Sequence, residues 1–131
     1  MKYAVIGSRD FNDYDLLEKI LLKEEKLETV ISGKAPGADR LAAEFAEKHS
    51  KELIEYKAKW DDLTHPDALI KVNKYGKKYD ARAGFRRNQL IIDDADVVLA
   101  FWDGNSTGTL DALKKAKKAG KITKIIKYLL L

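Results

Sequence analysis

Residues 97–102 read Val97-Val98-Leu99-Ala100-Phe101-Trp102, and the turn Asp103-Gly104-Asn105-Ser106-Thr107-Gly108-Thr109 follows directly. An uninterrupted apolar run of this length predicts a strand that is buried on both faces, as in a parallel sheet. The glycines and hydroxyl side chains predict a turn that leads into a helix. A buried strand, a polar turn and a helix form the repeating unit of parallel α/β domains.

The same unit recurs along the chain. Apolar runs predict further strands at 3–6, 29–31, 53–56 and 122–126. Helical spacing predicts helices after Asn12 or Asp13, from Ala38 to Ala46, from Phe85 to Asp94 with Leu90, Ile91 and Ile92 inside, and from Leu110 to near Gly120. We therefore predict a single Rossmann-like, three-layer α/β domain over residues 1–131, with a mostly parallel sheet of about five strands.

The composition excludes several classes of protein and of chemical site. The chain has 131 residues, of which 45% are hydrophobic and 35% are charged, enough for one domain with a real core. It has no cysteine and only two histidines, so we expect no disulfide, no thiolate nucleophile, no metal site and no cofactor. No run spans a bilayer and no leader is visible, so we expect a cytoplasmic protein without a membrane partner.

Positive charge is concentrated in two segments, although the net charge is only +4. Residues 68–87 carry seven basic side chains and one acidic side chain, and residues 114–131 carry seven lysines and no acid. Such segments favour anionic partners, either phosphates or nucleic acid. A solvated helix face is the favoured explanation of the second segment, whereas for the first segment the two explanations are balanced. The first segment has no clear period between residues 61 and 84, and we expect a long basic loop that closes as a lid over a bound anion.

Polar turns follow three of the predicted strands, and the carboxyl ends of parallel strands meet at one edge of a sheet. Helices that begin at such turns offer free N–H groups to phosphates. We expect Arg9 and Lys34 to hold phosphate and Asp39 to hold ribose, with Trp60 or Trp102 stacking on a base. The ligand-binding candidates from the three turns are Gly7, Ser8, Arg9, Ser32, Gly33, Lys34, Asp39, Gly104, Ser106, Gly108 and Thr109.

Short motifs spread over nearly the whole chain resemble the YspA-like family of the SLOG superfamily. They are Ile6-Gly7-Ser8-Arg9-x-Phe11, Ser32-Gly33-x-x-x-Gly37-Ala38-Asp39, Trp60, Tyr75-Gly76-Lys77, Ala83-Gly84-x-x-Arg87-Asn88, Ala95-Asp96 and Gly104-x-Ser106-x-Gly108-Thr109. The resemblance implies a Rossmann-like fold and adds Arg87 and Asn88 to the ligand-binding residues. Lys34 departs from the family, which usually has a glycine at that position.

The superfamily includes LONELY GUY-type phosphoribohydrolases, whose motif is Pro-Gly-Gly-x-Gly-Thr-x-x-Glu. Gly108-Thr109 is similar to the Gly-Thr of that motif, but its glutamate position falls on Ala112, with Asp111 one residue early. A helix turns about 100° per residue, so the Asp111 carboxylate is expected to point elsewhere. Catalysis by that route is disfavoured; Asp39 or Asp103 stays open as a replacement, and no catalytic residue is assigned.

The resemblance leaves three functions to weigh. The first is a protein that binds a nucleotide-derived ligand, such as an ADP-ribose-like or cyclic nucleotide signal, as a sensor or sequestering protein in defence or anti-defence. The second is a hydrolase or transferase acting on N-glycosidic bonds. The third is a single-stranded nucleic-acid binder similar to DNA-processing protein A, with residues 68–87 on the strand. The missing glutamate favours the first function over the second, and Tyr75 and Tyr79 within the basic stretch keep the third open. We rank the first highest, and we leave homo-oligomerisation open.

Overall fold

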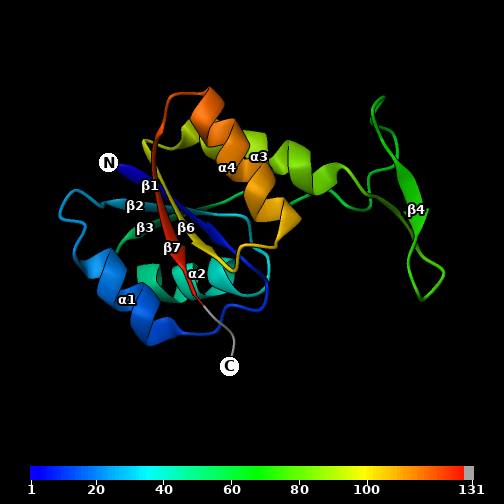
Figure 1. Ribbon diagram of the computed structural model, residues 1–131. Helices are drawn as coiled ribbons and strands as arrows, with labels where there is room; N and C mark the ends of the chain where they lie inside the picture. Colours follow the sequence, from blue (N-terminus) through cyan, green and yellow to red (C-terminus); the bar gives the residue numbers. More distant parts are fainter. Residues whose placement is uncertain (129–131) are drawn as a thin grey trace.

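The computed structural model describes residues 1–128, and this part of the chain contains seven strands and four helices (Figure 1). None of these helices combines the length and the apolar character needed to cross a membrane. The elements are β1 (Lys2–Gly7), α1 (Tyr14–Leu22), β2 (Thr29–Ser32), α2 (Ala38–Lys48), β3 (Glu52–Glu55), β4 (Ile70–Val72), β5 (Lys78–Asp80), α3 (Ala83–Asp94), β6 (Val97–Trp102), α4 (Thr107–Lys118) and β7 (Ile122–Lys127).

Five of the strands form a parallel sheet in the order β3-β2-β1-β6-β7, which confirms the predicted fold class. The strands β1 and β6 lie at the centre and pair over five positions, from Tyr3 with Val97 to Gly7 with Phe101. After β1 the chain continues to β2 and β3 on one side, whereas β6 leads to β7 on the other. The direction of winding therefore reverses between β1 and β6.

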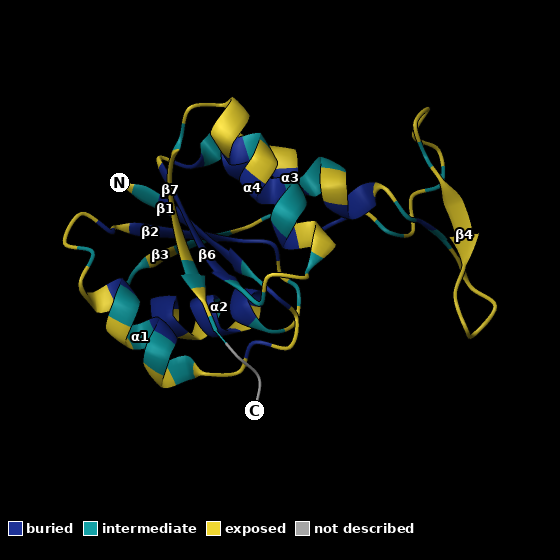
Figure 2. Cartoon of the chain, viewed as in Figure 1, coloured by how far each residue is buried: buried dark blue, intermediate teal, exposed yellow. Residues whose placement is uncertain are grey.

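Two helices cover each face of the sheet, as Figure 1 shows, and the strands alternate between two hydrophobic clusters. Val5, Leu99 and Phe101 pack toward α1 and α2, while Ala4 and Val98 pack toward α3 and α4. The central strands are buried on both sides (Figure 2). This double burial explains why these strands are apolar along their whole length rather than at every second position.

The predicted helices differ from the structure in small ways. The helix expected from Phe85 begins at Ala83, and of its expected inner residues Ile91 and Ile92 are buried while Leu90 is 54% exposed. Leu90 follows two residues after the buried Asn88, on the opposite side of a helix with 3.6 residues per turn. The prediction placed Leu90 on the inner face because of its apolar side chain, and this was wrong.

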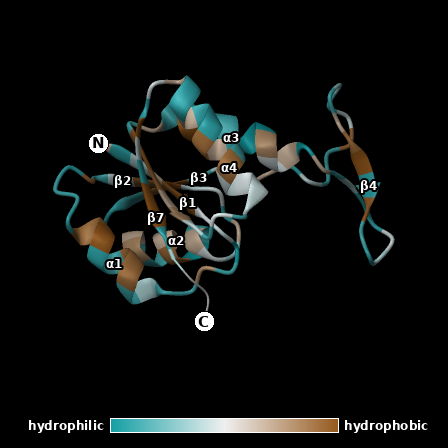
Figure 3. Ribbon diagram, viewed as in Figure 1, coloured by the Kyte–Doolittle hydropathy of each residue, from teal (hydrophilic) through white to brown (hydrophobic). Residues whose placement is uncertain are grey.

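The segment expected to be a loop and a lid is in part a β-hairpin. The strands β4 and β5 pair antiparallel, and the hairpin projects from the body (Figure 1). Of the expected lid, residues 61–84, only Ala81 and Gly84 at its end line the cleft described below, and the hairpin itself does not cover the cleft in this structure. The hairpin escaped prediction because each of its strands is only three residues long. The strand β4 carries hydrophobic residues (Figure 3), but three residues are too few for their alternation with Lys71 to indicate a strand.

Gly7 ends β1 at a point where the backbone is crowded from two sides. A Cβ atom at this position would collide with the carbonyl oxygen of Phe101 on β6 and would lie 2.7 Å from the Cβ of Ala38 on α2. Neither neighbour can swing away, because one is backbone and the other is the first side-chain atom of a buried residue. The absence of a side chain at Gly7 therefore sets how closely α2 approaches the two central strands.

We expect Gly7→Ala to lower the free energy of unfolding by about 1–3 kcal/mol, the usual range for overpacking a tight core. Gly108→Ala is the matched control: it lies in α4, and a Cβ there meets nothing within 4 Å. Adding a methyl group within a helix stabilises by about 0.4–1 kcal/mol. Urea denaturation of both variants measures the two effects, and equal stability of both would contradict the crowding at Gly7.

Candidate functional site

A cleft of about 600 Å³ lies beyond the carboxyl ends of β1 and β6. It is lined by the turn after β1, the turn after β6, the start of α2 and the first two turns of α3. This is the point where the winding of the sheet reverses, and open α/β sheets bind their ligands at such switch points. The predicted location of the site at the carboxyl edge therefore coincides with the cleft.

The turn after β1 is held by Ser8, which is 1% exposed. Its N–H donates to the carbonyl of Phe101, and its hydroxyl oxygen accepts from the N–H of Asp103, at 3.0 and 3.2 Å. Its own carbonyl accepts from the N–H groups of Phe11 and Ala38. Ser8 thus ties the turn to β6 and to α2, and Arg9 beside it is exposed at the cleft.

The turn after β2 contributes less to the cleft than the sequence predicted. Ser32 is fully buried and donates from its hydroxyl to the carbonyl of Asp39. Lys34 is exposed, has a φ of 58° and does not line the cleft, and neither do Ser32 and Gly33. Glycine adopts the left-handed φ of Lys34 at least cost, in agreement with the glycine that the resemblance to the YspA-like family implies at this position.

Asp39 lines the cleft but is already engaged by the protein. Its carboxylate accepts from the N–H of Ala35 at 3.2 Å and lies beside the Arg87 guanidinium. Burial raises the pKa of Asp39 to about 6, although these two groups favour its ionised form. The carboxylate therefore orders the turn after β2, and this role accounts for its position without the predicted ribose.

Arg87 and Asn88 lie on α3 and face the cleft. The Arg87 guanidinium donates to the carbonyls of Gly33 and Tyr56, and its Nε donates to the Asn88 side chain at 3.2 Å. Asn88 in turn donates to the carbonyl of Gly108 and to Asp111 on α4. Both side chains therefore join separate elements together as well as bordering the cleft.

Burial lowers the pKa of the Arg87 guanidinium, an effect that Asp39 opposes and Arg9 reinforces. The three charged groups are thus close enough to influence one another. The opposite charges of Asp39 and Arg87 offset each other, whereas Arg9 is exposed at the rim. Of the two arginines, Arg9 is therefore the one that an incoming anion can reach more easily.

The turn after β6 is arranged around Asp103. Its carboxylate accepts from the N–H groups of Asn105 and Ser106, both at 2.8 Å, and these bonds lower its pKa. Ser106 caps α4 by accepting from the N–H of Thr109. Ser106, Gly108 and Thr109 line the cleft as predicted, whereas Gly104 does not. Space above Gly108 leaves the first turn of α4 open toward the cleft.

The two tryptophans differ in position. Trp60 lines the cleft, and its ring packs so closely on Gly84 that a Cβ at residue 84 would approach it to 2.8 Å. Trp102 does not line the cleft, packs against the cluster under α3 and α4, and donates from its indole N–H to the carbonyl of Ser106. Of the two expected stacking residues, only Trp60 is positioned to meet a base in the cleft.

Some residues that line the cleft were not among the predicted ligand-binding residues. Asn105 and Thr107 lie within the turn that the sequence predicted after β6, between residues that were named as candidates. Gly84 belongs to the motif Ala83-Gly84-x-x-Arg87-Asn88, and the Trp60 ring packs against it where a side chain would not fit. Its place in that motif was the feature of the sequence that could have identified it. The others that escaped prediction are Ile6, Asp10, Ala35, Ala81, Phe85, Ile91 and Ala112.

The position of the phosphoribohydrolase glutamate is occupied by Ala112, which is buried at the cleft. Asp111 instead pairs with Lys115 at 2.5 Å and accepts from Asn88, and it does not line the cleft. The expected divergence of the Asp111 carboxylate from that position is confirmed. Of the acids left open as replacements, Asp39 and Asp103 both border the cleft and both accept backbone N–H groups.

The raised pKa of Asp39 predicts a specific effect of pH on folding. An aspartate has a pKa near 3.9 when unfolded and Asp39 has about 6 when folded, so its favourable contribution is complete below about pH 4 and is lost as pH rises through about 6. Asp39→Asn removes this titration. Between pH 4 and 7, wild type should lose stability relative to the variant, by on the order of 2–3 kcal/mol. Chemical denaturation across this range tests it, and parallel curves would contradict it.

Residues 1–62 match a family model described as the YspA, cpYpsA-related SLOG family. The match includes the turns after β1 and β2 and Trp60, whereas α3, the turn after β6 and the hairpin lie beyond it. A comparison with curated proteins found no match.

Two solved structures of DNA processing protein A share the fold. The protein from Streptococcus pneumoniae has a TM-score of 0.75 and 23% identity, and the one from Helicobacter pylori has 0.68 and 24%. The alignments cover 99% of this chain but only 51% and 66% of those proteins. The resemblance drawn from the motifs is thus confirmed: residues 1–62 are similar in sequence to the YspA, cpYpsA-related SLOG family, and nearly the whole chain has the Rossmann-like fold of DNA processing protein A.

Proposed function

We propose that this protein binds single-stranded nucleic acid and that the cleft receives one nucleotide of the strand. The observation that carries the proposal is the convergence of Arg9, the open first turn of α4 and Trp60 on one cleft at the switch point of the sheet. The Helicobacter pylori protein of similar fold is described by its single-stranded DNA binding mode. In this proposal residues 1–131 act as one SLOG-like unit in the cytoplasm.

Each part of a nucleotide has a matching group in the cleft. The N–H groups at the start of α4 and the Arg9 guanidinium suit a phosphate, because helix N-termini and arginine both favour anions. The half-buried Trp60 offers a ring surface for a base, and stacking of this kind tolerates any base. Single-strand binding without strong sequence preference follows from these contacts.

Three carboxylates also border the cleft, and their contacts determine how strongly they oppose a phosphate. Asp10 accepts from the hydroxyl of Tyr128, Asp39 from Ala35, and Asp103 from Asn105. These bonds spread the negative charge onto the protein's own donors. The cleft is consequently suited to one nucleotide held by directed contacts, rather than to a long stretch of backbone held by charge alone.

A nucleotide-derived small ligand is the second candidate, because a volume of about 600 Å³ falls within the range of small-ligand pockets. An ADP-ribose-like or cyclic nucleotide signal suits such a space, and binding it would give the protein a sensing or sequestering role in defence. The two candidates differ in one measurable property. A strand gains affinity from nucleotides beyond the cleft, whereas a small ligand does not.

The first prediction of the proposal concerns Arg9. Arg9→Gln should weaken binding of a fluorescent oligothymidylate of about 12 nucleotides by roughly fivefold to thirtyfold, because it removes one charge-assisted phosphate contact. Arg40→Gln is the control, since Arg40 is an exposed arginine of α2 outside the cleft. Fluorescence anisotropy at fixed salt measures both. Equal losses in the two variants would show that net charge, and not the cleft, controls binding.

The second prediction separates the two candidate functions. The same oligothymidylate should bind at least about tenfold more tightly than thymidine monophosphate or ADP-ribose, because stacking adds about 1–3 kcal/mol per further base. Competition against the labelled oligonucleotide gives the ratio. If ADP-ribose binds more tightly than the oligonucleotide, the small-ligand function replaces the proposed one.

A further inference from the structure

The hairpin of residues 69–80, here called the arm, is a second surface separate from the cleft. It projects beyond the carboxyl edge of the sheet and away from the body (Figure 1), and every residue from 69 to 78 is exposed (Figure 2). No residue of the arm lines the cleft. The arm is therefore open to a partner on both of its faces.

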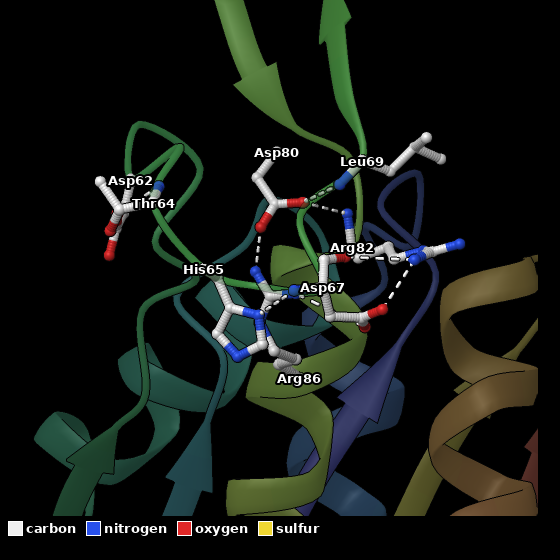
Figure 4. Close-up of polar contacts among 8 residues, drawn as sticks. All are labelled: Asp62, Thr64, His65, Asp67, Leu69, Asp80, Arg82 and Arg86. Carbon is white, nitrogen blue, oxygen red and sulfur yellow. Dashed lines mark hydrogen bonds and ion pairs between the residues drawn. The ribbon is translucent and has the colours of Figure 1, made fainter.

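The base of the arm is firmly attached to the body. Asp80 is fully buried and accepts from the N–H groups of Leu69 and Arg82 and from the Arg86 guanidinium of α3 (Figure 4). These bonds outweigh the effect of burial and keep the pKa of Asp80 below its ordinary value. The N–H of Asp80 also donates to the carbonyl of Trp60 at 2.9 Å. The arm is thus presented in a defined direction.

A second ion pair braces the same junction. Arg82 pairs with Asp67 at 2.7 Å, so that the residues on either side of the arm are joined to each other (Figure 4). The N–H of Ala81 donates to the carbonyl of Leu69 at 2.8 Å. Both strands of the arm are therefore held together at the point where they leave the body.

Lysines lie on both faces of the arm and at its tip. Lys71 pairs with Tyr79 and so shares one face with it, whereas Lys78 pairs with Val72 and lies on the opposite face. Lys74 lies in the turn between the strands. Lys77 forms an exposed ion pair with Asp61, and residues 69–79 contain no acid.

Large apolar side chains are exposed beside these lysines. Ile70 and Val72 are 50% and 59% exposed on one face, and Tyr75 in the turn is 81% exposed. A two-stranded hairpin has little stability of its own in water. The combination of exposed apolar groups with unopposed positive charge indicates a partner that is both apolar and anionic.

We propose that the arm inserts into a groove of double-helical nucleic acid. The major groove of B-DNA is about 12 Å wide and admits a two-stranded ribbon, whose strands lie about 4.8 Å apart. Lysines on opposite faces then meet phosphates on both walls of the groove, while apolar side chains contact sugars and thymine methyl groups. A single strand lies along only one face, and a second copy of the arm is repelled by the same lysines.

This inference goes beyond the proposed function, because it concerns another surface and another form of nucleic acid. The test compares Lys71→Gln/Lys74→Gln/Lys78→Gln with the control Lys114→Gln/Lys117→Gln/Lys118→Gln, which removes the same charge from exposed positions of α4. The probe is a blunt fluorescent DNA duplex of about 20 base pairs, or two helical turns. Circular dichroism and thermal melting verify that both variants fold.

The arm variant should bind the duplex at least about tenfold more weakly than wild type, and its plot of log K against log salt should be shallower by about 2–3, since each phosphate contact contributes about 0.9. The control should stay within about threefold of wild type. Oligothymidylate binding should change little in either variant.

Three results would overturn the inference: no duplex binding by wild type, equal losses in the two variants, or a loss confined to the oligothymidylate. The last would place a single strand on the arm. Failure of oligothymidylate binding in wild type refutes the proposed function of the cleft, and the duplex measurement remains interpretable without it.

Discussion

The packing around Gly7 and Ser8 is the constraint on which the rest of the site depends. Gly7 allows α2 to approach β1 and β6 because it has no side chain between them. Ser8 then satisfies its backbone groups and its hydroxyl with partners on β6, α2 and the following turns. Three segments that are distant in sequence consequently meet within hydrogen-bonding distance at the carboxyl edge, and the cleft is the space that remains between them.

Buried charge is the second constraint, and it follows from the first. Once α2 and the turn after β2 are drawn in, Asp39 loses contact with water and its pKa rises to about 6. The Arg87 guanidinium lies beside it and donates to two backbone carbonyls of the β2 and β3 ends. Charged side chains in such a place are retained only when they are paired and hydrogen-bonded. Much of the polarity of the cleft therefore maintains its own shape, and Arg9 and the start of α4 remain for a ligand.

The cleft and the arm differ in how their charged groups are arranged. Around the cleft, cations and carboxylates are mixed and mostly bonded to the protein. On the arm, the lysines are exposed, and only Lys77 has an acidic partner among residues 1–128. The attraction of such exposed charges for an anion increases with their number and weakens strongly as the salt concentration rises. The cleft at the sheet edge and the arm held through Asp80 are separate surfaces.

Local pattern was sufficient for the main sheet and for the turns at its edge. The apolar run of β6 and the glycine and hydroxyl residues after it reflect burial on both faces and a change of direction, and both properties are encoded within a few neighbouring residues. Contacts between distant residues required the folded chain. Arg87 reaches a carbonyl 54 residues away, and nothing near Arg87 in the sequence indicates that bond.

The arm and the tryptophans are further features that local sequence patterns could not predict. The strands of the arm are three residues each, too short for their alternation to indicate strands, and the arm is attached to the body through Asp80 and α3. Trp60 follows β3 and Trp102 ends β6, yet only Trp60 lines the cleft, where Gly84 of α3 leaves room for its ring. Residue type and spacing identify which side chains are available for a site, while the packing of elements brought together from distant parts of the chain determines which of them reach it.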